Sequence, residues 1–462
     1  MEAELSKQLK YIRRVVDYRE RLFFDLADPD QLWQEASTKN VKKIVVIAAA
    51  SRSGSSLLFS VLKKIPGMYS LSGESVPFYK INGFSSDAFP SDEIPREVSS
   101  DKKKISGFSR DFLSDFSFAA QTSPIIKEEN MRERYINDLA LRFSLQWPEV
   151  DFSPGIFKRL ASEAYTLYLK GHQVFRVEEF YLELILSLRR QYPKINPYYY
   201  DLPGRMIRKK FPALKIPSGP ASSVLTIEEP PFILLTPCLK PKKEDLLTKT
   251  LLLKSSADCY RLPFLKTVFP KATIKVVYLT RNPLGSINGL YDGWLYRGFF
   301  SHNLKESLKN SNDCLKISGY SDRYSWGKYW WKYDLPARWR AYAHKRLEEV
   351  CAFQWYSANA AIQQYLDKTK MKYCSVKYEN IIGSAATRAK EMVKLINFIG
   401  LKAAAFKDLD LDRLPVVQAT EPPKNYRWKK REGMLLPFLV DARIAAMSES
   451  LGYRQDKLKE WF

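Results

Sequence analysis

Cysteine and histidine are scarce in this chain of 462 residues, which holds five of the first and three of the second. The cysteines stand at positions 238, 259, 314, 351 and 374. An odd number at such wide spacing matches neither a disulfide framework nor the paired ligands of a zinc site. We therefore expect no bound metal and a protein of the reducing cytoplasm.

Long apolar runs are also missing. No run approaches the roughly 18 residues that a bilayer-spanning helix needs, which leaves peripheral membrane contact as the only membrane role to consider. Residues 1–40 mix charged with apolar side chains and predict an N-terminal helical arm on the surface.

Acidic residues are fewer than basic ones: the chain has 51 aspartates and glutamates and 74 lysines and arginines, which gives a formal net charge of +23. Such an excess favours an anionic partner: a multiply phosphorylated small molecule, an acidic polymer or an acidic membrane surface. A single nucleotide would use only a few of these charges, so the excess hints at a second anionic partner. No nucleic-acid-binding motif is present, so we expect no specific nucleic acid ligand.

The most informative segment lies at residues 44–65. Residues 44–50 are an unbroken apolar run, typical of a strand buried on both faces. Residues 51–56 follow as a small polar loop of sequence Ser-Arg-Ser-Gly-Ser-Ser, after which apolar residues recur at helical spacing. Strand, loop and helix in this order bring free backbone N–H groups and the positive end of a helix dipole to one point. The segment therefore predicts a phosphate or sulfate site.

Strands and helices alternate again in the second half of the chain. Strand patterns occur at 251–253, 274–279 and 371–377, and helical patterns at 257–268, from 281 onwards and at 384–399. We expect an α/β fold with a central parallel sheet flanked by helices and a ligand site at the carboxyl ends of the strands.

The expected domain spans residues 41–460 and is interrupted at about 95–245 by an insertion. Helical patterns occur there at 129–147 and 158–191, while residues 193–241 carry ten of the 26 prolines and predict irregular structure. The insertion is either a lid on the substrate side or a structural decoration.

The polar loop departs from the phosphate-binding loop of nucleotide triphosphatases, Gly-x-x-x-x-Gly-Lys-Ser/Thr. No glycine stands at the first position, and Ser55 follows Gly54 where the lysine belongs. A kinase-like phosphotransferase is therefore the enzymatic alternative, not the first choice.

Residues 52–58, Arg-Ser-Gly-Ser-Ser-Leu-Leu, instead resemble the 5′-phosphosulfate loop of sulfotransferases that use 3′-phosphoadenosine 5′-phosphosulfate (PAPS). Four further matches follow in the family's order. Residues 254–272 resemble the family's strand-end lysine and its Leu-x-x-Leu-x-x-x-Phe-Pro-x-Ala spacer, and residues 278–283 resemble its 3′-phosphate strand and turn. Residues 378–401 resemble its Tyr-Glu-Asp-Leu segment with the helix that follows, and residues 427–453 resemble its C-terminal pattern.

The resemblance covers about residues 41–82 and 250–455, and its catalytic segments are most similar to the tyrosylprotein branch. It implies a P-loop-like sulfotransferase fold that uses PAPS as co-substrate, releases 3′-phosphoadenosine 5′-phosphate (PAP) and needs no metal.

The resemblance also implies a role for each matched residue. Arg52 and Lys254 would hold the transferring group, and Glu74 would take the acceptor's proton, with Ser75 as the alternative at that position. The family usually places a serine eight residues after the 3′-phosphate arginine, but Gly289 stands there, so Ser286 or Asn288 would substitute. The implied cofactor-binding set is Arg52, Ser53, Gly54, Ser55, Ser56, Arg281, Ser286, Asn288, Arg427 and Lys429.

The acceptor is left open by the sequence. It would offer a hydroxyl or phenol on a small molecule, a carbohydrate or a lipid, with or without negative charge. A non-catalytic basic protein that binds acidic polymers or surfaces is the alternative outside enzymes. The oligomeric state is not predicted.

Overall fold

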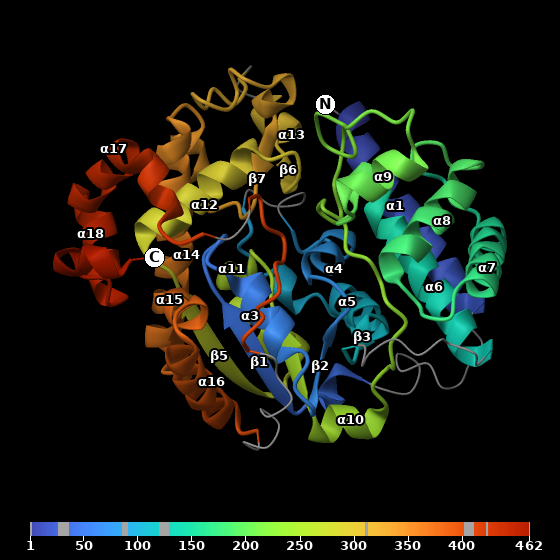
Figure 1. The fold of residues 1–462 in the computed structure, drawn as a ribbon, viewed down its shortest axis with the longest axis horizontal. Helices are drawn as coiled ribbons and strands as arrows, with labels where there is room; N and C mark the ends of the chain where they lie inside the picture. The colour runs from blue at the N-terminus through green and yellow to red at the C-terminus, as the bar shows by residue number, and fades with distance from the viewer. Residues whose placement is uncertain are drawn as a thin grey trace.

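The computed structural model describes residues 2–25, 37–85, 91–119, 129–309, 313–401, 411–421 and 424–461. A six-stranded sheet in the order β3-β2-β4-β1-β5-β8 lies at its centre (Figure 1). Neighbouring strands run parallel, except that β3 is antiparallel to β2. The strands span Lys43–Ala48 (β1), Met68–Leu71 (β2), Phe116–Ser117 (β3), Thr250–Leu253 (β4), Thr273–Thr280 (β5) and Tyr373–Lys377 (β8).

Strand β1 is buried on both faces, as its unbroken apolar run predicts. Val45 and Ile47 belong to the hydrophobic core on one face of the sheet, and Ile44 and Val46 belong to the core on the other face. The predicted α/β class with a mainly parallel, doubly covered sheet is confirmed. The covering helices are α3 (Ser55–Leu62) and α16 (Ala385–Ile399) on the first face, and α11 (Asp258–Val268), α12 (Pro283–Leu295) and α14 (Leu347–Thr369) on the second.

A second hydrophobic core lies in a group of helices beside the sheet (Figure 1). Helix α1 (Glu2–Asp25) contributes Tyr18 and Leu22 to this core and Val15 to the core of the sheet, so it joins the two. The other helices of the group are α6 (Glu129–Gln146), α7 (Pro154–Gly171), α8 (Val177–Arg189) and α9 (Gly204–Lys210).

The region expected as an insertion is divided between the two cores. Helix α5 (Lys102–Ser114) places Phe108 and Phe112 in the core of the sheet, and β3 follows it at the sheet edge. Residues 190–242 hold only α9 and one short turn, Pro197–Tyr199, as their many prolines predict.

The remaining elements flank the sheet or follow it in the chain. Among the described residues, no helix is long and apolar enough to cross a membrane. These elements are α4 (Val76–Ile81), α10 (Lys243–Thr248), α13 (Lys305–Lys309), α15 (Tyr378–Ile382), α17 (Glu432–Leu435), α18 (Ala442–Ser450) and the antiparallel pair β6 (Phe300–Asn303) and β7 (Trp330–Lys332).

Candidate active site

A cavity of about 610 Å³ lies where four parallel strands end. Its lining includes the loop after β1, Lys254 after β4, Arg281 after β5 and Tyr378 after β8. The strand order changes direction at β1. The connection after β1, through α3, leads past β4 to β2 on one side, whereas β5 lies on the other side of β1. Open α/β sheets bind ligands at such switch points.

The loop after β1 has an unusual backbone. Arg52 and Gly54 both adopt left-handed conformations, with φ of 65° and 91°. A Cβ atom on Gly54 would lie 2.2 Å from a ring carbon of Tyr378, so only glycine fits beside that ring. Helix α3 then begins at Ser55, and its first N–H groups have no partner within the helix. The loop and the helix start therefore have the backbone arrangement from which the sequence predicts an anion site, and anion binding there stays a prediction.

Arg52 and Arg281 open onto this same cavity. Arg281 donates from Nη1 to the carbonyl oxygen of Arg52 at 2.9 Å, and its guanidinium lies 4.6 Å from the centre of the Tyr378 ring. Burial lowers the pKa of Arg281, and the positive charge of Arg52 lowers it further. Arg427 also lines the cavity, and within the described residues the buried Nε atoms of all three arginines have no hydrogen-bond partner.

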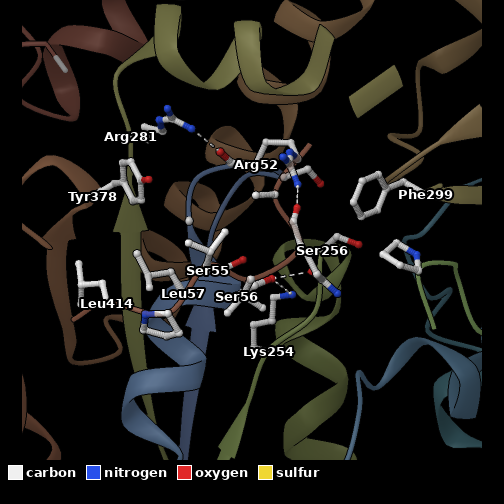
Figure 2. Close-up of a pocket in the computed structure, with 18 of the residues that line it drawn as sticks. Arg52, Ser55, Ser56, Leu57, Lys254, Ser256, Arg281, Phe299, Tyr378 and Leu414 are labelled. Carbon is white, nitrogen blue, oxygen red and sulfur yellow. Dashed lines mark hydrogen bonds between the residues drawn. The ribbon is translucent and has the colours of Figure 1, made fainter. Parts of the chain in front are cut away.

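Lys254 connects the polar loop to Glu74. Its Nζ donates to Ser56 Oγ at 2.9 Å (Figure 2). The same Nζ forms an ion pair with Glu74. The lysine side chain is 6% exposed and that of Glu74 is 31% exposed, so the carboxylate is the more accessible partner. The two residues implied as catalytic beside Arg52 therefore meet at the cavity, next to the start of α3.

Residues 411–421, which we call the strap, cross the loop and are absent from the predicted site. Arg52 donates from Nη1 to the carbonyl oxygen of Gln418 at 2.9 Å and from Nη2 to Thr420 Oγ1 at 3.4 Å. Ser56 donates from Oγ to Gln418 Oε1 at 2.8 Å. Gln418 has a φ of 48°, which is uncommon for a residue other than glycine. The strap oxygens therefore engage donors that would serve an anion.

Four residues of the implied binding set do not line the cavity. Ser53 and Ser286 are buried against each other, with their Oγ atoms 3.3 Å apart. Asn288 is buried and accepts a hydrogen bond from Arg431 at 2.5 Å. Lys429 is exposed, and its ammonium lies over the ring of Tyr426. Direct ligand contact by these four residues stays a prediction.

The surroundings of Gly289 explain why this chain has no serine at the position where the resemblance predicts one. A Cβ atom at this position of α12 would lie 3.3 Å from Arg52 Cβ and 3.5 Å from Arg281 Nη1. The helix face that meets the loop thus has little room for a side chain, because the two arginines already fill it.

Asp292 on α12 anchors the basic segment at 427–431. Arg427 donates to its carboxylate at 2.7 Å, and Arg431 and Lys430 form ion pairs with it at 2.7 and 3.2 Å. Arg427, but not Lys430 or Arg431, also lines the cavity. Asp292 was not predicted by sequence reasoning, because nothing around it resembles a motif.

Phe299, which lies beyond Arg52 (Figure 2), and Tyr333 line the far end of the cavity, and Glu228 and Glu229 line the same cavity. The Phe299 ring lies 5.3 Å from the Arg52 guanidinium and stacks on Tyr333 with ring centres 5.1 Å apart. These residues were also missed, since Glu228 and Glu229 belong to the irregular proline-rich region and Phe299 to a loop.

Comparison of the chain with protein-family models, with curated proteins and with solved structures gave no match.

Proposed function

We propose that the protein is a sulfotransferase that moves a sulfonate group from PAPS to the hydroxyl or phenol oxygen of an acceptor. One observation carries the proposal: Arg52 and Arg281, the cations implied for the two ends of the donor, line a single cavity and are joined by a hydrogen bond. The positive charge of Arg52 lowers the pKa of Arg281, and an anion bound beside both guanidiniums would relieve this repulsion.

The residues that line the cavity suit the separate parts of PAPS. The start of α3 and Arg52 suit the 5′-phosphosulfate, and Arg281 with Arg427 suits the 3′-phosphate, because their planar forks match phosphate oxygens. Tyr378, Leu57 and Leu414 form an apolar wall on the Arg281 side of the loop, where the base would lie (Figure 2). The partnerless Nε atoms of the three arginines are further support.

Bound PAPS would supply an activated sulfonate with a phosphate as the leaving group. In the transfer, the acceptor oxygen forms a bond to sulfur while the bond from sulfur to the bridging phosphate oxygen breaks. Lys254 and Arg52, which both line the cavity, would stabilise the charge that develops on the transferring group and on the bridging oxygen. Glu74 is the carboxylate beside Lys254 and is assigned the acceptor's proton.

A thermal-shift comparison of PAP with ADP and AMP tests the donor half of the proposal. Binding to the folded state raises the melting temperature, so PAP should stabilise the protein more than either nucleotide without a 3′-phosphate. Equal stabilisation by all three would overturn the proposal. Stabilisation by ATP with Mg²⁺ and not by PAP would favour the phosphotransferase alternative.

Transfer of labelled sulfonate from PAPS to a mixture of phenols and alcohols, measured with and without a chelator, tests the reaction itself. Because Arg52 and Lys254 are assigned the charge stabilisation, transfer should persist in the chelator.

A further inference from the structure

The cavity has two ends of opposite character. Figure 2 places Arg281 and Tyr378 on one side of Arg52 and Phe299 on the other. The donor end carries arginines, whereas the residues that line the far end include glutamates, prolines and aromatic rings. The backbone ties the far end together, because Phe299 N donates to the carbonyl oxygen of Pro230 at 2.6 Å. Glu229 precedes this proline and therefore lies on the Phe299 side.

The three glutamates of the cavity differ in how their charges are balanced. Glu74 is paired with Lys254, and Glu228 accepts from Arg142 and Gln146, each at 3.0 Å. Among the described residues, Glu229 forms no ion pair. Ser301 donates a hydrogen bond to its carboxylate, and the charges of Lys80, His302 and Lys332 act on it from a longer distance. Burial raises the pKa of Glu229, Lys80 opposes the rise, and the Glu74 carboxylate adds to it.

The aromatic wall of this end suits a flat ring. Phe299 and Tyr333 stack with an angle of 26° between their planes, and Pro231 lies beside Gly298 at the same end. A ring that lies against this wall could bring a phenol oxygen towards Glu74 and Lys254 in the middle of the cavity. Because one cavity of about 610 Å³ must hold the donor as well, the part of the acceptor that enters it is small.

Resting on the proposed sulfotransferase function, we infer that the acceptor is a small phenolic amine whose ammonium group binds at Glu229. An acceptor carboxylate or sulfate would instead bring a second negative charge beside Glu229 and Glu74, which is unfavourable at a partly buried site. The phenol oxygen forms the new bond to sulfur, its proton passes to Glu74, and PAP leaves with the electron pair of the broken bond.

Three phenols of similar size but different charge test the inference: 4-hydroxyphenethylamine, 4-ethylphenol and 3-(4-hydroxyphenyl)propionate. The expected order of kcat/KM with PAPS is cation, then neutral phenol, then anion. A buried hydrogen bond to a charged group corresponds to a preference of about tenfold for the amine over ethylphenol. Glu229→Gln should bring the ratio of kcat/KM for the amine to that for ethylphenol close to one. Glu163 is an exposed carboxylate on α7, and Glu163→Gln should leave the ratio unchanged.

Each outcome decides between the two proposals. An equal or reversed preference in the unmodified protein overturns the phenolic amine, whether or not Glu229→Gln folds. Stabilisation by PAP without sulfation of any phenol also overturns the acceptor class, while the donor site stands. Absence of PAP binding overturns the sulfotransferase itself.

Discussion

Arg281 donates a hydrogen bond to the main-chain carbonyl of Arg52, so the second arginine is held by the backbone of the first. This contact closes the left-handed turn at Arg52 and fixes two cations at one wall of the cavity. The buried Arg281 guanidinium loses hydration, and the proximity of Arg52 adds repulsion, which both show in its lowered pKa. A bound anion would recover part of that energy.

Arg281→Lys should therefore weaken PAP binding by about tenfold or more, because an ammonium cannot present the planar fork. The affinity for AMP, which has no 3′-phosphate, should fall much less. Titration calorimetry with both nucleotides measures the difference, and Arg443→Lys, an exposed arginine paired with Asp441, is the matched control. An equal loss for PAP and AMP would remove Arg281 from 3′-phosphate recognition.

Gly54→Ala should destabilise the fold and close the site. The new methyl group meets the Tyr378 ring, and a positive φ is unfavourable for alanine, so a cost of about 1–3 kcal/mol is expected. Gly433→Ala is the control, since nothing lies within 4 Å of its Cβ position. Urea unfolding measures both, and Tyr378→Ala in the Gly54→Ala background should recover the steric part alone. No recovery would mean that strain in the loop is the whole cost.

The parts of the site that the sequence predicts are the local ones. The buried strand, the polar loop, Lys254 and Arg281 each follow from a short pattern at a strand end, and parallel strands bring those ends together. The strap and the Phe299 end of the cavity have no such pattern. Gln418 reaches Arg52 across 366 positions of sequence, a contact that only the folded chain reveals.

The helical period explains why Ser286 and Asn288, which were expected to bind the cofactor, do not line the cavity. Gly285 and Gly289, four positions apart, form the face of α12 that meets Arg281 and Arg52. Ser286 and Asn288 are turned away from that face, towards Ser53 and Arg431. A strand as short as β3 was likewise beyond prediction, because two residues carry no period.

Lys254→Ala should lower turnover by about 10²- to 10³-fold, the usual scale for removing one charge-stabilising donor. The fold should persist, because Glu74 is partly exposed and water can replace its partner. Lys249→Ala provides the control, since Lys249 precedes β4 whereas Lys254 follows it. Single-turnover rates with melting temperatures test this, and unchanged turnover would exclude Lys254 from the mechanism.

Asp334 should make stability fall as the pH rises from about 4 to 7. Burial raises the pKa of Asp334 to about 7, although the hydroxyls of Ser51 and Tyr260 donate to it and oppose the rise. The folded state then holds a proton that the unfolded state has released, which gives a slope of up to about 1.4 kcal/mol per pH unit. Asp334→Asn should remove that part of the slope in urea unfolding, and the exposed Asp367→Asn should not. Parallel curves for Asp334→Asn and the unmodified protein would contradict this.

Gln418→Ala should tighten PAP binding. The side chain of Gln418 accepts the hydroxyl hydrogen of Ser56, so a phosphate oxygen must displace it to use the same donor. Removal of one such hydrogen bond corresponds to about 0.5–1.5 kcal/mol, or a gain of roughly 2- to 10-fold in affinity. Arg413→Lys alters the same strap at an exposed side chain that does not line the cavity, and it should leave the affinity unchanged. Weaker binding by Gln418→Ala would instead mean that the strap holds the nucleotide, and that Gln418 and the phosphate share Ser56 rather than compete for it.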